Sequence, residues 1–191
     1  MASKIKVDQI QTADGTGTIA LQNQLSGLTS ASMPTGSSLQ TKHMFTNDSS
    51  GQSVTSTSFI DVANLTLNIT PASTSNKVLV QANLHNYLTS HSTDGWNACD
   101  FQIIRRIGGS DTVAFESFKN DGSGHGYTAG AYVRDDETRF MWVTPIHFLD
   151  SPNTTSEITY KVKVRAKDSN FTVTFNDTYC RCSIVLQEIK G

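Results

Sequence analysis

The residue type best suited to metal binding or proton transfer in this chain is histidine, found at His43, His85, His91, His125 and His147. No two of them stand two or four residues apart, the spacing that puts two imidazoles on one face of a strand or helix. His85 and His91 could approach Asp94 or Asp100, but solvated loop positions explain these residues more simply. We therefore expect no metal site.

The acidic residues give no better evidence of catalysis. Asp135-Asp136-Glu137 are consecutive, whereas glycoside hydrolysis needs two carboxylates that face each other across a sugar. A hydrophilic turn is the simpler interpretation. The sequence also contains no nucleophile elbow, phosphate-binding loop or paired Cys and His. We predict that the protein is not an enzyme, with no catalytic residue and no cofactor.

Three cysteines, Cys99, Cys180 and Cys182, complete the reactive side chains. A disulfide between residues two apart would be strained, and two thiols without a nearby histidine make a poor zinc site. We expect all three to be reduced and partly buried.

Composition excludes some partners. The 191 residues carry a net charge of −2, and only 17% are charged, whereas 22 serines and 24 threonines supply much of the polarity. A chain without a basic face has no general affinity for nucleic acid or anionic membrane. It contains neither an apolar run of about 20 residues nor a secretory signal. We therefore expect synthesis in a cytoplasm and no membrane insertion.

Apolar residues recur at every second position through most of the chain. In 77–85, Val78, Val80, Ala82 and Leu84 share one face, and 157–167 alternates in the same way. About ten such segments, separated by turn signals, lie between residues 58 and 189, and helical periodicity is nearly absent. The pattern predicts an all-β fold: an antiparallel β-sandwich, most simply a jelly roll.

Two further segments predict contacts with other chains or molecules. The segment 140–149 is apolar on both faces, which indicates a subunit interface at Met141, Val143, His147 and Leu149; a central strand under a long loop is the alternative. The loops 87–96 and 120–127 mix aromatic and small polar residues. They could contact a host glycan or protein through Tyr87, His91, Trp96, His125 and Tyr127.

Residues 1–50 differ from the rest. They begin with the alternating stretch "SKIKVDQIQTADGTGTIALQNQ" and continue rich in Ser, Thr, Gly and Gln. Such a composition buries too little apolar surface to offset the cost of ordering. We predict an extended attachment arm at 1–50 and a sandwich head at 51–191. The arm contacts would come from Ile5, Val7, Ile10, Ile19 and Leu21.

The stretches "SKIKVDQI" and "ADGTGTIAL", together with 57–84, resemble fibre-like structural proteins of marine tailed bacteriophages, including those that infect cyanobacteria. The resemblance implies a homotrimeric virion protein, attached by its arm to other phage proteins of the tail or capsid. Its head would face outward and recognise a host surface. No long repeated shaft is present, which leaves a tail fibre, a head fibre or a capsid decoration protein open. A lectin-like carbohydrate-binding module is a further alternative.

Overall fold

The computed structural model describes residues 32–46, 50–89, 95–117, 129–133, 139–166, 172–177 and 181–191. The chain divides into two units, Met1–Met33 and Pro34–Gly191, and the second contains every described strand. Within the described residues, no helix is long and apolar enough to cross a membrane.

The first of the two layers is a six-stranded antiparallel sheet. Its longest strand, β4 (Lys77–Thr89), pairs along one edge with β8 (Arg139–Asp150). The other edge of β4 pairs first with β11 (Ser183–Ile189) and then with β10 (Thr172–Asp177). Beyond these lie β1 (Ser38–Phe45), next to β11, and β2 (Ser50–Val54), next to β10.

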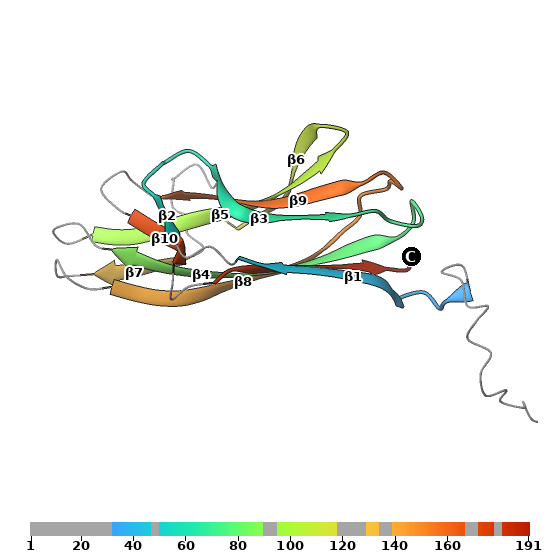
Figure 1. Cartoon of the computed structure of the whole chain (residues 1–191), viewed down its shortest axis with the longest axis horizontal. Coiled ribbons are helices and arrows are strands. Elements are labelled where there is room, and N and C mark those ends of the chain that lie inside the picture. The colour runs from blue at the N-terminus through green and yellow to red at the C-terminus, as the bar shows by residue number, and fades with distance from the viewer. Residues whose placement is uncertain are drawn as a thin grey trace, which may run out of the picture. The chain divides into compact units, whose positions relative to one another are not determined.

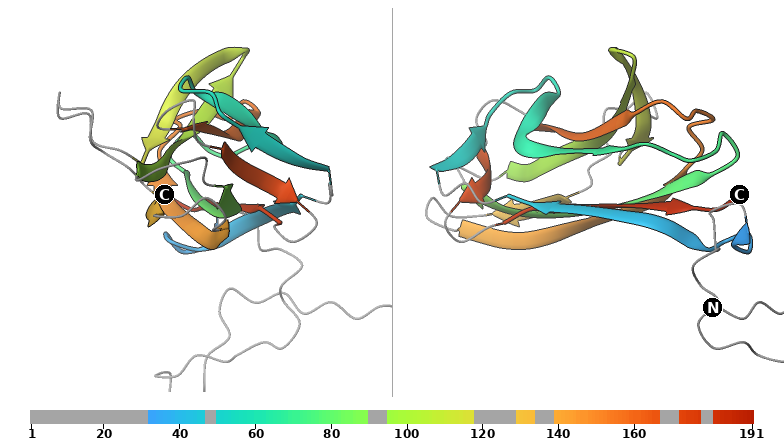
Figure 2. Two further views of the ribbon diagram at one scale, coloured as in Figure 1. Left: turned by 90° about the vertical axis from the view of Figure 1, so that its left-hand side faces the viewer. Right: turned by 45° about the vertical axis from the view of Figure 1, so that its right-hand side comes forward.

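The second layer has five strands in an equivalent arrangement. Strand β9 (Ile158–Ala166) lies between β3 (Ile60–Ile69) and β5 (Gly95–Ile107). The far edge of β5 pairs with β6 (Ser110–Glu116) over one half and with β7 (Ala129–Val133) over the other. Figure 1 shows β3, β5, β6 and β9 in the upper layer and β1, β4 and β8 in the lower, and Figure 2 shows the same layers from two other sides.

The strand order confirms the predicted fold class. When β1, β3, β4, β5, β6, β8, β9 and β11 are taken as strands one to eight, one sheet runs one-eight-three-six and the other two-seven-four-five. This is the order of a jelly roll. Such a sandwich brings chain segments that are distant in sequence side by side, so the outer face of each sheet is built from several separate parts of the sequence.

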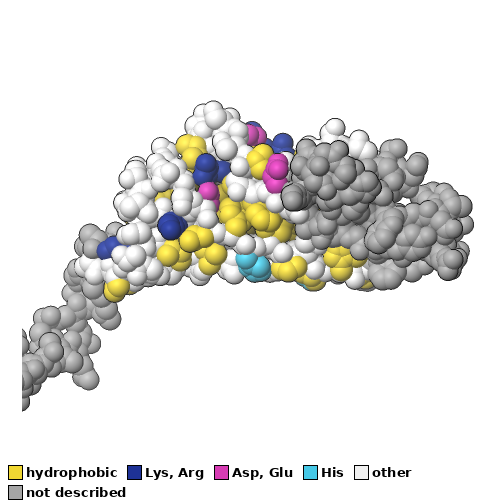
Figure 3. Space-filling model, turned by 180° about the vertical axis from the view of Figure 1, so that it is seen from behind, with side chains coloured by type: hydrophobic (Ala, Val, Ile, Leu, Met, Phe, Trp, Pro, Cys, Tyr) yellow, Lys and Arg dark blue, Asp and Glu magenta, His cyan; other side chains and the backbone are white. Residues whose placement is uncertain are grey.

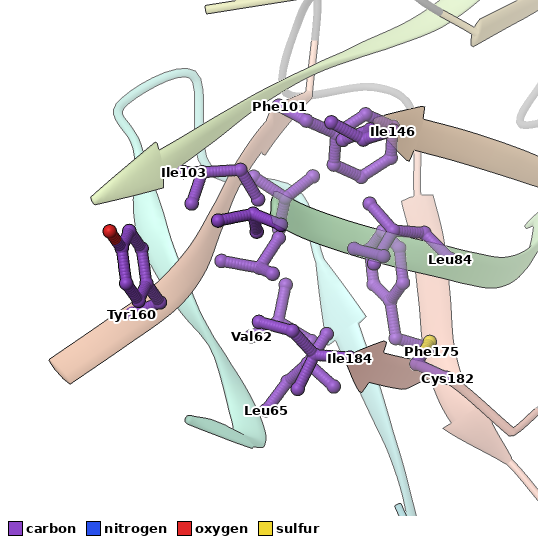
Figure 4. Close-up of a cluster of buried hydrophobic side chains, with 14 of the residues drawn as sticks. Val62, Leu65, Leu84, Phe101, Ile103, Ile146, Tyr160, Phe175, Cys182 and Ile184 are labelled. Atoms are coloured by element: carbon purple, nitrogen blue, oxygen red, sulfur yellow. The ribbon is translucent and has the colours of Figure 1, made fainter. Parts of the chain in front are cut away.

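The core lies between the inward faces of the two sheets. The alternation predicted in β4 puts Val78, Val80, Ala82 and Leu84 inside with no exposed surface. Figure 4 shows side chains from both sheets pointing toward one another, and the rings of Phe101 and Phe175 meet edge to face at 5.9 Å. Burial of each large apolar side chain contributes roughly 1.5–3 kcal/mol, so these inward faces hold the layers together.

Local backbone features mark where the strands bend or turn. Asn64 has a φ of 58° and lies within a register shift of β3 between Asp61 and Thr66, so regular pairing with β9 resumes only at Thr66. The β5–β6 hairpin turns through Gly108 and Gly109, with φ values of 55° and 86°. Glycine adopts such positive φ angles without a steric penalty.

Two details differ from the sequence expectations. Residues 38–45, within the range expected to form the arm, form β1 of the sandwich. Tyr87 and Trp96, expected in a loop, belong to β4 and β5. Pairing with β8 and β10 prolongs β4 to Thr89, which leaves a shorter connection than the sequence suggested.

Candidate interaction face

The outer side of the six-stranded sheet forms a continuous surface over β8, β4, β11 and β1. Because side chains alternate across a strand, every second residue points away from the core, and all of these outward residues are exposed or half-buried. We call this surface the low-charge face; it consists of Thr41, His43, Phe45, Lys77, Leu79, Gln81, Asn83, His85, Tyr87, Met141, Val143, Pro145, His147, Leu149, Ser183, Val185, Gln187 and Ile189.

This face contains almost no charge. Among the described side chains assigned to this face, Lys77, near one end, is the only lysine or arginine, and none is an aspartate or glutamate. In the view from behind, hydrophobic side chains and one histidine lie along the lower side of the sandwich, and the acidic side chains in view all lie above them (Figure 3). Polarity on the low-charge face comes instead from amides, hydroxyls and imidazoles.

The outer side of the five-stranded sheet has the opposite character. Lys161 Nζ lies 3.0 Å from Asp111 Oδ2 and 3.4 Å from Asp61 Oδ2, and Arg106 Nε lies 2.5 Å from Asp111 Oδ1. The hydrogen bonds from Arg106 and Lys161 lower the pKa of Asp111 to about 2. Arg165 also pairs with Asp100 at 2.9 Å. The two outer faces of one sandwich therefore differ sharply in charge.

Large apolar side chains on the low-charge face are unusually exposed. The exposed fractions are 57% for Met141, 45% for Val143, 49% for Leu149 and 52% for Phe45. Three of the four stand on β8, and cross-strand pairing extends that row: Met141 lies opposite Tyr87, and Leu149 lies opposite Leu79. Burial of such a contiguous row is favourable by roughly 25 cal/mol per Å² of apolar area.

The face also provides neutral hydrogen-bonding groups. Gln81 Nε2 lies 3.2 Å from His147 Nδ1 across the β4–β8 pair. Val185 is paired with Gln81 on the other edge of β4, and His43 lies opposite Val185, so two imidazoles stand in one cross-strand row. Such groups can both donate and accept hydrogen bonds without the desolvation cost of an ion.

The inward side of β8 is covered by the sandwich itself. Phe148 stacks on Phe115 of β6 with ring centroids 5.2 Å apart. Trp142 is half-buried and donates from Nε1 to Thr144 Oγ1 at 3.1 Å. Since β8 pairs only with β4 among the described strands, it is an edge strand rather than a central one. Its two apolar faces therefore have separate explanations: one fills the core, and the other is exposed.

The structure brings together all four residues predicted for a subunit interface, Met141, Val143, His147 and Leu149, on the outer side of β8. Tyr87, which was expected in a receptor-binding loop, lies next to these residues on β4, opposite Met141. Trp96 lies in β5. The remaining predicted site residues fall outside the described residues: Ile5, Val7, Ile10, Ile19, Leu21, His91, His125 and Tyr127.

The structure does not bring together the candidate metal-binding or catalytic residues that it describes. His85 points outward from one sheet, whereas Asp100 pairs with Arg165 on the other. In the part of the chain that the structure describes, no three His, Cys, Asp or Glu residues gather as metal ligands. Cys99 and Cys182 are buried thiols, and burial raises the pKa of Cys99. Cys180 and Asp135-Asp136-Glu137 lie outside the described residues.

Sequence reasoning missed most of the low-charge face. Phe45 and His43 stand in a segment whose overall composition suggested an arm, and Leu79 and Val185 looked like ordinary alternating strand positions. A usable signal was present in the outward positions of β4 and β11, which carry amide, hydroxyl, imidazole and aliphatic groups where a solvated strand normally carries charges.

Comparison with known proteins gives only loose likenesses. No protein-family model matches the chain, and no curated protein matches it. Among solved structures, the structure of the infectious bursal disease virus Gt strain is 12% identical with a TM-score of 0.40, covering 81% of this chain and 39% of that one. The VP2 subviral particle of infectious bursal disease virus is 15% identical with a TM-score of 0.38, covering 80% and 38%.

A bacterial structure, dimeric latent PorU from Porphyromonas gingivalis, is 14% identical with a TM-score of 0.33, covering 78% of this chain and 13% of that one. The present chain thus spans about two fifths of the length of the two viral chains, at 39% and 38%. Likenesses with TM-scores of 0.40 and below support no inference about what this chain does.

Proposed function

We propose that this chain is a non-enzymatic structural protein of a virion, which associates with further copies of itself through the low-charge face. The self-association is inferred from the contrast between the two outer faces. The outer face of the five-stranded sheet carries several ion pairs. The low-charge face instead exposes large apolar side chains among uncharged polar groups, namely Met141, Val143, Leu149 and Phe45. A sheet face exposed to water normally carries charged side chains, and a face covered by a partner normally carries exposed apolar side chains and few charges.

The partner that fits this surface is a second copy of the chain. A face with almost no charge offers no ionic partner to a charged surface. Binding of such a surface would remove water from its charged groups without compensating ion pairs, which costs free energy. A like face, by contrast, brings the same mixture of apolar side chains and donor–acceptor groups. Two or three such faces can bury their apolar rows against one another without burying an unpaired charge, as in symmetric oligomers.

The virion role is supported by the resemblance of "SKIKVDQI", "ADGTGTIAL" and 57–84 to fibre-like phage proteins. On this proposal, the protein is a homotrimer attached through its N-terminal segment to a tail or capsid protein. A tail-fibre-like role with a host glycan or protein as receptor is the first form of the proposal. A capsid decoration protein, which projects without binding a receptor, is the second.

Self-association is tested with a matched pair of substitutions. Val143→Lys puts a charge within the exposed apolar row of β8 on the low-charge face, whereas Val113→Lys puts one on β6 of the other sheet at a valine with the same exposed fraction, 45%. We expect sedimentation velocity to show oligomers for the unchanged protein and Val113→Lys, and monomers for Val143→Lys. A monomeric unchanged protein, or equal behaviour of both variants, would contradict the proposal.

The virion role has its own experiment. Protein lacking residues 1–31 should stay folded but no longer enter assembling particles, and antibody labelling of complete particles should decorate either the tail or the head. Normal incorporation of the truncated chain would refute attachment through this segment. Binding on an array of bacterial surface glycans would favour the receptor-binding form over the decoration form.

A further inference from the structure

Two imidazoles stand in one row across the low-charge face. His43 of β1 lies opposite Val185 of β11. Val185 in turn lies opposite Gln81 of β4, and Gln81 lies opposite His147 of β8. Histidine is the residue type whose charge changes between about pH 5 and pH 8. The row is therefore uncharged in mildly alkaline solution and gains positive charge in mild acid.

Each imidazole adjoins a large exposed apolar side chain. Phe45 follows His43 by two residues and is 52% exposed. Leu149 follows His147 by two residues and is 49% exposed. Residues two apart on a strand lie on the same side of the sheet, about 7 Å from each other. A partner that buries Phe45 and Leu149 therefore also removes water from both imidazoles, and the loss of that water disfavours their protonated form.

The contact that His147 makes within its own sheet also requires a neutral ring. Gln81 Nε2 lies 3.2 Å from His147 Nδ1. An amide nitrogen only donates hydrogen bonds, so Nδ1 must accept, and a ring nitrogen accepts only when it carries no proton. Protonation of Nδ1 turns this hydrogen bond into a contact between two donors, and the Gln81 amide would have to turn over to restore it.

The low-charge face offers these two imidazoles no described carboxylate. The described residues around them on their own and adjoining strands are all uncharged: Thr41, Phe45, Ser183, Val185, Gln187, Leu79, Gln81, Asn83, Pro145 and Leu149. Of the other titratable groups on the face, His85 and Lys77 can only add positive charge, and tyrosine stays neutral in this pH range. Arg181 is a further cation; it directly precedes Cys182, whose Sγ lies 3.3 Å from the carbonyl oxygen of His85.

The carboxylates on the neighbouring elements have partners of their own. They are Asp61 with Lys161, Asp111 with Arg106, Asp150 with Arg105, Glu116 with Gln102 and Glu188 with Asn76. Glu157 and Lys42 line a groove at the flank where β1 packs against β3, and strand alternation puts Lys42 and His43 on opposite sides of β1. A second copy of the low-charge face likewise brings no described carboxylate to neutralise a protonated imidazole.

We propose that mild acid dissociates the oligomer formed through the low-charge face, with His43 and His147 as the pH-sensitive groups. This inference rests on the proposed self-association and names its regulation. Both rings are exposed in the single chain and can bind protons there, whereas the oligomer excludes those protons, so association weakens as the pH falls. The ordinary pKa of histidine is about 6.5, so excluding one proton weakens association about tenfold at pH 5.5.

The test compares the full-length protein with a His43→Gln/His147→Gln variant, because glutamine keeps hydrogen-bonding groups but cannot be protonated in this range. Sedimentation velocity at pH 8.0 and pH 5.5, at equal ionic strength, gives the dissociation constant of the oligomer. Tryptophan fluorescence shows at each pH whether the chain stays folded. We expect the dissociation constant of the unchanged protein to rise about a hundredfold or more at pH 5.5, and the rise for the variant to be at least about tenfold smaller.

The outcomes separate this inference from the proposed function. A protein that is already monomeric at pH 8.0 contradicts the self-association, and this inference with it. Oligomers that persist at pH 5.5 overturn the pH sensitivity alone, as does a variant that dissociates as readily as the unchanged protein. Dissociation that accompanies unfolding of the chain also overturns it, because the proposal requires folded monomers.

Discussion

Tyr160 donates a 2.6 Å hydrogen bond from its hydroxyl to Asp150 Oδ2, which joins β9 of one sheet to the end of β8 in the other. Arg105 Nη1 lies 2.8 Å from Oδ1 of the same carboxylate, and the backbone N–H of Ser151 also donates to it. The edge strand that carries the exposed apolar row is thus anchored at one end by a buried charge with three partners.

Removing the Tyr160 hydroxyl should weaken this anchor. Tyr160→Phe keeps the ring in the core and deletes one hydrogen bond to a carboxylate, which typically contributes about 1.5–3 kcal/mol. We expect the free energy of unfolding, measured in urea, to fall by about this amount. A loss below about 0.5 kcal/mol would show that Arg105 and Ser151 suffice to satisfy Asp150.

The same contact predicts a dependence on alkaline pH. Burial, with a smaller contribution from Asp150, raises the pKa of Tyr160 above its ordinary value of 10.0. Above pH 10 the unfolded chain therefore loses a proton that the folded chain retains, so stability falls as the pH rises. Urea titrations from pH 9 to 11 should show a shallower decline for Tyr160→Phe than for the unchanged protein; equal slopes would contradict this.

Asp111 predicts the opposite dependence at acidic pH. Its pKa is lowered from 3.8 to about 2 by Arg106 and Lys161. A group with a lowered folded-state pKa contributes stability above its unfolded value, and that contribution disappears as the pH falls from about 4 to 2. Asp111→Asn should therefore reduce the loss of stability over this window, measured by thermal unfolding. An acid profile of Asp111→Asn that matches the profile of the unchanged protein would contradict this prediction.

Glu188 provides a test of the connection between β1, β11 and the β3–β4 loop. Its carboxylate is 1% exposed and accepts 2.6 Å hydrogen bonds from Ala72 N, Asn76 Nδ2 and Gln40 Nε2. Glu188→Gln replaces one of the two accepting oxygens by an NH₂ group, which then faces a donor, and should cost about 1–3 kcal/mol. Hydrogen exchange should also quicken at Ala72. Glu116→Gln, at an exposed pair with Gln102, should change stability by less than about 0.5 kcal/mol.

The sequence was sufficient for the sandwich and for one row of the candidate site. Alternation in 77–85 and 157–167 is a direct consequence of a sheet with one buried face, and it located β4 and β9. The doubly apolar 140–149 likewise located β8 and its outward row. These predictions succeeded because apolar burial, which sequence reports directly, dominates the energetics there.

Prediction failed where backbone pairing rather than side-chain burial supports a strand. Residues 38–45, "SLQTKHMF", contain few apolar groups, and only Met44 packs against the core. Pairing with β11 from Ser38 to Phe45 supplies what composition lacks. Because that pairing joins residues about 140 to 150 positions apart, no local sequence pattern predicts it. The same pairing brings His43 and Phe45 to the low-charge face.

The turn at Gly108 and Gly109 has a practical consequence. A β-carbon at either position would meet no atom within 4 Å, and the turn joins β5 to β6 in the sheet opposite to the low-charge face. A short epitope inserted between these two glycines would project freely into solvent. Antibody capture through such an epitope would then follow the protein and any assembly it forms, while leaving the low-charge face unobstructed.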